Sequence, residues 1–139
     1  MYAILLFLHF VGLMIGAAGG LGGAILGRRA LSMPPEQAQT VRSLGPFLAN
    51  VAAVGVVVLW LSGLALVWMR GGFGDLPSLF WVKFAFVIAV TVLVGLVHMT
   101  YAELRRTKNP AVAGRLAILG PLTGLANLIV VLTACFAFL

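Results

Sequence analysis

Four long apolar stretches constrain the fold of this chain more than any other feature. They cover about 3–27, 46–69, 79–102 and 116–139 of the 139 residues. The hydrocarbon core of a bilayer is about 30 Å thick, and an apolar helix needs roughly 20 residues to cross it with all its backbone groups paired. Each stretch therefore predicts one transmembrane helix. The expected fold is an all-α membrane protein, with residues 1–139 forming a single four-transmembrane-helix bundle.

The composition agrees with this expectation. Apolar residues make up 63% of the chain and charged residues only 9%, which no ordinary soluble domain matches. The first stretch directly follows Met1 and lacks the basic leader and the small-residue cleavage site of a signal peptide, so we expect it to be retained. The single cysteine, Cys135, is expected to be a small buried side chain of the last helix.

The basic residues indicate an orientation and no nucleic-acid partner, because they gather at helix ends and not on one face. The first and third connections hold seven of them: Arg28, Arg29, Arg42, Arg105, Arg106, Lys108 and Arg115. The second connection has only Arg70, opposed by Asp75. By the positive-inside rule the first and third connections face the cytoplasm, which places both termini on the outer side.

A repeated pattern suggests that the bundle consists of two tandem helical hairpins. Arg28-Arg29 and Gly45-Pro46 in the first half are echoed by Arg105-Arg106 and Gly120-Pro121 in the second. Ser32 and Asn109, which precede prolines, are expected to cap the helices that follow. The repeat predicts two hairpins of the same orientation, packed around an axis along the membrane normal.

His9 is the most informative polar residue, because a polar group inside a membrane helix is costly unless it is partnered. With 3.6 residues per turn, it shares one face of the first helix with Gly12 and Gly16, and a line of glycines continues to Gly27. Bare backbone of this kind lets another surface approach closely. That surface is either a neighbouring helix, as in GxxxG pairs, or a flat porphyrin whose iron the imidazole would bind.

The third helix carries an inward-facing polar stripe of Lys83, Thr91, His98 and Tyr101. Lys83 lies near the outer interface, where it either reaches toward water or serves a function. His98 should lie about 10 Å deeper or shallower than His9, too far for both to bind one iron. We therefore expect His98 to bond Asn50, or another group of the inner half, or to hold a second cofactor.

The fourth helix contributes two polar residues one turn apart, Thr123 and Asn127. Neither has a charged partner in the sequence pattern. We expect both to form hydrogen bonds between helices.

The residues resemble a known superfamily, that of HemJ-type protoporphyrinogen oxidases and CopD-type proteins. The resemblance rests on Leu8-His9-Phe10 before a glycine-rich helix, Arg28-Arg29 at its end, and Trp81-Val82-Lys83-Phe84 opening a third helix that reaches His98. It covers the four-helix layout over nearly the whole chain. The basic and aromatic signature that follows the first helix in HemJ proteins is missing here.

The resemblance implies haem b binding and a redox role in a bacterial cytoplasmic membrane, with His9 and Lys83 as the functional pair. His9 would be an axial ligand, with Lys83 or Met69 as the second or the second position left open, and Lys83 or Arg70 would pair the propionates. The enzymatic activity implied is that of a haem-dependent oxidoreductase of the protoporphyrinogen oxidase type.

Two alternatives stay open. A CopD-like protein would handle copper through His9 and Met14, and a non-catalytic accessory subunit would dock its glycine face on a larger membrane complex or on a second copy as a homodimer. With only Glu36, Asp75 and Glu103 as carboxylates, no hydrolytic site can be assembled.

Overall fold

The computed structural model describes residues 1–74 and 76–136, apart from the side chain of residue 135. The expectations for Asp75 and for the Cys135 side chain therefore fall outside the described residues. The elements are α1 (Tyr2–Arg29), the 3-10 turn η1 (Ala30–Ser32), α2 (Pro35–Ser43), α3 (Gly45–Met69), α4 (Ser78–Thr107) and α5 (Pro110–Phe136).

These six elements form four long segments and confirm the all-α, four-helix prediction. Helix α1 with η1, helices α2 and α3 together, α4 and α5 form four segments that are long and apolar enough to cross a membrane. The described part of the chain contains no strand. The short helix α2 is polar and lies at the end of the bundle, ahead of the apolar α3.

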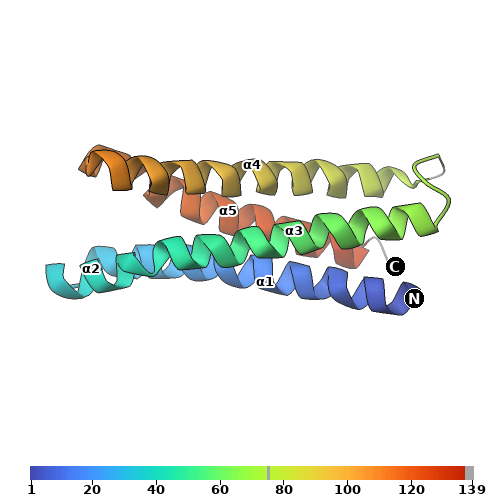
Figure 1. Cartoon of the computed structure of the whole chain (residues 1–139), viewed down its shortest axis with the longest axis horizontal. Coiled ribbons are helices and arrows are strands. Elements are labelled where there is room, and N and C mark those ends of the chain that lie inside the picture. Colours follow the sequence, from blue (N-terminus) through green and yellow to red (C-terminus); the bar gives the residue numbers. More distant parts are fainter. Residues whose placement is uncertain (75, 137–139) are drawn as a thin grey trace.

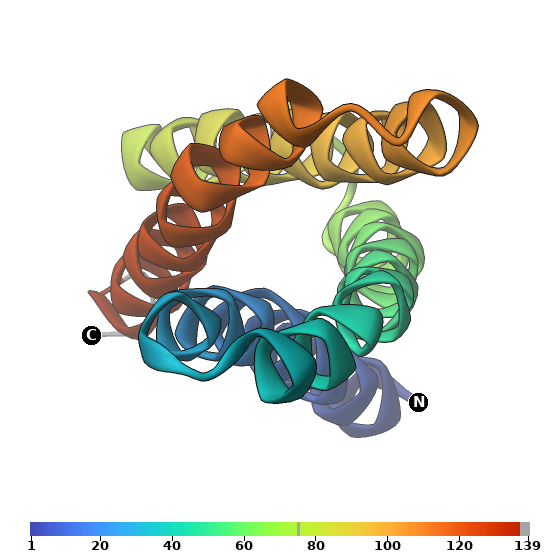
Figure 2. The ribbon, with the colours of Figure 1, turned by 90° about the vertical axis from the view of Figure 1, so that its left-hand side faces the viewer.

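The helices form a ring in the order α1, α3, α4, α5 (Figure 2). Each of the four long helices, α1, α3, α4 and α5, runs opposite to the next. The amino terminus, the α3–α4 loop and the end of α5 therefore lie at one end of the bundle (Figure 1). The most extensive packing joins α1 to α3, followed by α4 to α5 and α1 to α5, whereas α3 and α4 touch least. This pairing agrees with two helical hairpins that meet mainly through α1 and α5.

Of the two predicted helix caps, the structure confirms one. Asn109 Oδ1 accepts a hydrogen bond from the Ala111 amide at 3.0 Å, which confirms it as a cap of α5. Pro46 lies in the first turn of α3, where its missing N–H costs nothing. The prediction for Ser32 was wrong, because its hydroxyl donates back to the Arg29 carbonyl and Pro34 precedes α2 instead.

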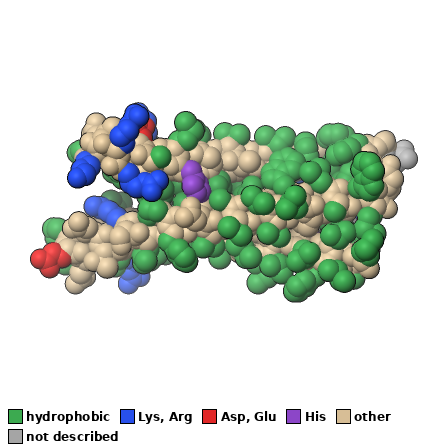
Figure 3. Space-filling view, viewed as in Figure 1, with side chains coloured by type: hydrophobic (Ala, Val, Ile, Leu, Met, Phe, Trp, Pro, Cys, Tyr) green, Lys and Arg blue, Asp and Glu red, His purple; other side chains and the backbone are tan. Residues whose placement is uncertain are grey.

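The outside of the bundle is apolar along most of its length, and Lys and Arg side chains gather at the end opposite the termini (Figure 3). Many large hydrophobic side chains are exposed, among them Phe7, Met14 and Leu61, and none of the large side chains that the structure describes is fully buried. The core is built mostly of small and branched residues, such as Ala52, Val90 and Val130. A bundle with a small-residue interior and an apolar exterior is suited to contact with lipid.

Candidate functional site

The polar centre of the bundle joins α1, α3 and α4 through His9. Its side chain is only 5% exposed. His9 Nδ1 lies 3.0 Å from Ser62 Oγ, and His9 Nε2 lies 3.2 Å from Lys83 Nζ. The two residues that the sequence resemblance paired, 74 positions apart, are therefore in hydrogen-bond contact.

The partners of Ser62 fix the tautomer of this imidazole. The Ser62 hydroxyl donates its proton to the Val58 carbonyl at 2.6 Å, so its oxygen can only accept from His9 Nδ1–H. His9 Nε2 then carries a lone pair, and it accepts a hydrogen bond from the Lys83 ammonium, which has only donors. A histidine whose Nδ1–H is held by a second group presents the arrangement of a metal-binding or proton-accepting imidazole.

Glycines on α3 make room for this centre. A Cβ at Gly63 would lie 3.2 Å from His9 Cε1, so the imidazole rests against bare backbone of α3. A Cβ at Gly55 would clash with the Gly16 amide nitrogen and come within 2.8 Å of the Gly12 carbonyl oxygen. The close approach of the α1 and α3 backbones thus positions His9 over Ser62.

One half of the glycine face of α1 packs against α3, and the other half lines a cavity. A Cβ at Gly12 would lie 3.0 Å from the Leu59 amide nitrogen, so α3 already covers the half next to His9. The porphyrin seat expected on Gly12 and Gly16 is therefore occupied by another helix. Further along the face, Gly20, Gly23 and Gly27 line a cavity.

Lys83 turns inward and does not reach toward water. Its side chain is partly buried, and aromatic rings surround the first turns of α4. Phe80 stacks on Phe84 at 5.9 Å, and Trp81 contacts both rings edge-on. A small space of about 50 Å³ beside Lys83 is walled by apolar side chains of α3 and α4.

The remaining predicted stripe of α4 also faces its neighbours. Thr91 Oγ1 accepts a hydrogen bond from Trp60 Nε1 at 3.0 Å and donates to the Val87 carbonyl. His98 Nε2 lies 3.0 Å from Asn50 Oδ1, which confirms the expected partner. Tyr101 lies against Gly45 of α3.

His9 and His98 occupy different levels of the bundle. Their partners on α3, Ser62 and Asn50, are 62 − 50 = 12 residues apart, which corresponds to about 18 Å along a helix axis. The separation is larger than the 10 Å expected from sequence. The two histidines therefore belong to separate sites.

The other predicted residues do not join the centre around His9. Arg70 donates to the Tyr2 hydroxyl at 3.0 Å and lies over the Tyr2 ring, at the exposed end of the bundle. Met14, 71% exposed, points away from His9. No group of three His, Cys, Asp or Glu side chains that could hold a metal ion occurs in the described ranges.

The expected hydrogen bonds between helices fail on α5. Thr123 donates to the Leu119 carbonyl of its own helix. Asn127 is buried, and its Nδ2 has no hydrogen-bond partner within the described part of the chain. Asn127 Nδ2 instead lies close to Gly20, where a Cβ would come within 2.7 Å of it.

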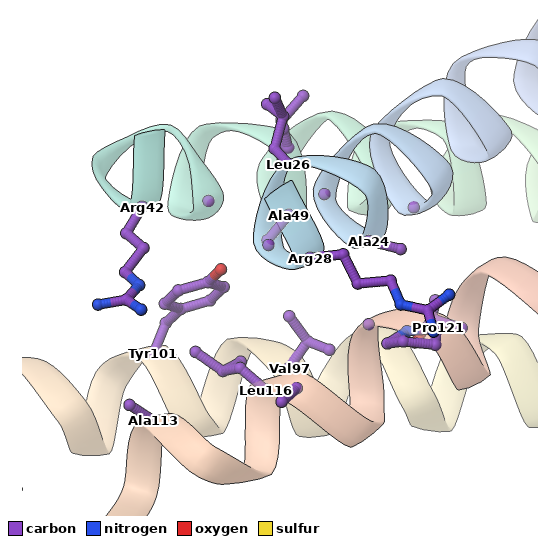
Figure 4. A pocket seen from close by; sticks show the side chains of 18 of the residues that line it. Ala24, Leu26, Arg28, Arg42, Ala49, Val97, Tyr101, Ala113, Leu116 and Pro121 are labelled. Atoms are coloured by element: carbon purple, nitrogen blue, oxygen red, sulfur yellow. The ribbon is translucent and has the colours of Figure 1, made fainter. Parts of the chain in front are cut away.

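A cavity of about 450 Å³ lies at the basic end, between the four long helices. Arg42, Arg28 and Tyr101 extend into the space between α1 and α3 on one side and α4 and α5 on the other (Figure 4). Sequence reasoning missed this cavity and the role of Ser62. Small residues at helical spacing on α5, Ala113, Gly114, Ala117 and Gly120, were the available signal.

No protein-family model, no curated protein and no solved structure matches this chain.

Proposed function

We propose that this chain is an integral membrane redox protein of the HemJ-like kind, in which His9 and Lys83 form the functional pair and haem b or a related porphyrin is the cofactor. The observation that carries the proposal is the 3.2 Å contact between Lys83 Nζ and His9 Nε2. The resemblance named these two residues from different helices, and the folded chain brings them together.

The chemistry of the pair supports a role in proton or electron transfer. The Nδ1 proton of His9 is held by Ser62, and Nε2 faces an amine that can give or take a proton. A lysine and a histidine buried together in an apolar bundle are costly to maintain, and such groups in membrane helices are typical of functional sites. An anchoring lysine would need no imidazole beside it.

His9 has the chemistry of a haem ligand, but the helices leave no room for the porphyrin beside it. The imidazole has the tautomer that a metal ligand needs, and a bound haem would supply one-electron chemistry. However, Lys83 holds Nε2, α3 covers Gly12 and Gly16, and the adjoining space has only about 50 Å³. A haem bound through His9 therefore does not fit between the helices as they are packed, and it requires Lys83 to leave Nε2 and α1 to separate from α3.

The alternatives receive less support from the arrangement of side chains. The copper proposal needs His9 and Met14 to converge, and they point in different directions. The accessory-subunit proposal needs a free glycine face, and α3 and the cavity use that face within the chain. A homodimer would have to form on another surface.

The proposed orientation places both termini on the outer side and the arginine-rich end in the cytoplasm of a bacterial cell. It rests on the seven basic residues of the first and third connections. The His9–Lys83 pair would then lie in the outer half of the membrane.

Absorption spectra of the protein purified after haem-supplemented expression test the proposal. Wild type should show a Soret band, His9→Ala should lose it, and Lys83→Gln should reduce it or shift the redox potential. The matched control is His98→Ala, which removes the other intramembrane imidazole and should leave the band in place.

Two results would contradict the proposal. A wild type without porphyrin would remove the cofactor. Equal loss of the band in His98→Ala and His9→Ala, in protein that still inserts, would show that His9 has no special role.

A further inference from the structure

The cavity at the basic end is separate from the His9–Lys83 centre. Neither His9 nor Lys83 lines it, and its walls are formed by small and apolar side chains such as Gly23, Ala49 and Leu116. Nothing in the proposed redox role uses this space. The cavity therefore needs a separate explanation.

An apolar space of this size can hold a small apolar molecule. Its volume is about 450 Å³, whereas an engineered apolar cavity of about 150 Å³ is already large enough to bind benzene. Water would find few hydrogen-bond partners on walls of glycine, alanine, leucine and valine. The cavity is therefore suited to a molecule with an apolar body.

The polar groups of the cavity are positive. Arg28, near the end of α1, extends toward Pro121, and Arg42, near the end of α2, extends beside Tyr101 (Figure 4). The ion pair between Arg115 and Glu103 is the only one among residues 1–74 and 76–136, so neither arginine is neutralised by a described carboxylate. The Tyr101 hydroxyl adds a possible donor beside them.

We infer that the cavity binds an anionic membrane lipid, with an acyl chain between the four helices and the acidic head group at the basic end, which Arg28 and Arg42 line. Basic pockets between transmembrane helices attract phosphate head groups, because one guanidinium group can donate two parallel hydrogen bonds to phosphate oxygens. Figure 3 shows the molecule hollowed at its basic end, between the tips of the two hairpins. An anionic lipid from the surrounding leaflet supplies an apolar chain for the cavity and a negative charge for the two arginines.

Lipid retention by the full chain in nanodiscs tests the charge half of this inference. With phosphatidylglycerol and phosphatidylcholine supplied equally, native mass spectrometry after detergent transfer should find mainly phosphatidylglycerol bound. The double variant Arg28→Gln/Arg42→Gln should lower its retention at least about tenfold. Arg29→Gln/Arg106→Gln removes the same charge from arginines that do not line the cavity, and should retain the lipid.

A second pair of variants tests the apolar half. Neither Gly114 nor Gly95 has an atom within 4 Å of an added Cβ, but only Gly114 lines the cavity. Gly114→Leu should displace the lipid, and Gly95→Leu should not. Equal retention of both lipids, a loss that is the same in both arginine variants, or unchanged binding in Gly114→Leu would overturn the inference. So would a Soret-absorbing molecule that depends on Arg28 and Arg42, because it would make the occupant a porphyrin and not a lipid.

Discussion

Lys83 Nζ and His9 Nε2 lie 3.2 Å apart, although most of α1 and all of α2 and α3 separate the two residues in the chain. The contact exists because α1 and α3 approach through glycines and carry His9 toward the first turns of α4. Ser62 holds the other side of the ring.

The two residues should be energetically coupled. In a double-mutant cycle, His9→Ala and Lys83→Met should be non-additive by about 1 kcal/mol, because each residue is the hydrogen-bond partner of the other. The free energy of unfolding can be measured by titration with dodecyl sulfate in mixed micelles. His9→Ala and His98→Ala serve as the control and should add within about 0.5 kcal/mol, since they share no partner. Coupling of equal size in both cycles would contradict separate sites.

Ser62 should be needed to hold the imidazole. Ser62→Ala leaves His9 Nδ1–H without an acceptor and should cost about 1 kcal/mol in the free energy of unfolding. It should also change the imidazole nitrogen resonances in solid-state NMR spectra. Thr100→Val removes a buried hydroxyl that bonds only its own helix, and should leave those resonances unchanged. Identical histidine spectra in wild type and Ser62→Ala would argue against the assigned tautomer.

The contact between α1 and α3 should tolerate no added methyl group at its centre. A Cβ at Gly55 would meet the Gly16 amide nitrogen and lie 2.5 Å from the Gly16 Cα atom, so Gly55→Ala must push the two backbones apart. The expected destabilisation is about 1–3 kcal/mol. Gly95→Ala, where the added group meets nothing within 4 Å, is the matched control and should be close to neutral. A fully stable Gly55→Ala would show that the helices are not in contact there.

Cysteine labelling should place the two ends of the bundle on opposite sides of the membrane. In a background without Cys135, an impermeant reagent added outside should reach Gly74→Cys and not Gln39→Cys. Gly74 is a better probe than Gly72, whose φ of +93° would strain a cysteine. The expectation follows from the basic residues near Gln39 and their scarcity near Gly74. If the reagent labelled Gln39→Cys and not Gly74→Cys, the orientation would be the opposite of the one predicted.

The sequence by itself determined the number and type of the long apolar helices. Apolar stretches of about 20 residues leave the backbone no other way to pair its polar groups in lipid, and four such helices are present. The 3.6-residue period also predicted that Thr91, His98 and Tyr101 face the other helices, and the expected depth of His98 favoured Asn50 as one of its possible partners.

Only the tertiary structure decided what covers each helical face. Periodicity places Gly12, Gly16, Gly20 and Gly23 on one face of α1, yet it cannot tell that α3 packs on the first two while the others line a cavity. Ser62, with nothing unusual in its sequence context, became the partner of His9 in the same way. The physical reason is that a repeat along one helix fixes only the direction in which each side chain points around the helix axis. Contacts depend also on the tilt and distance of the neighbouring helices, and small residues on both helices together set that distance.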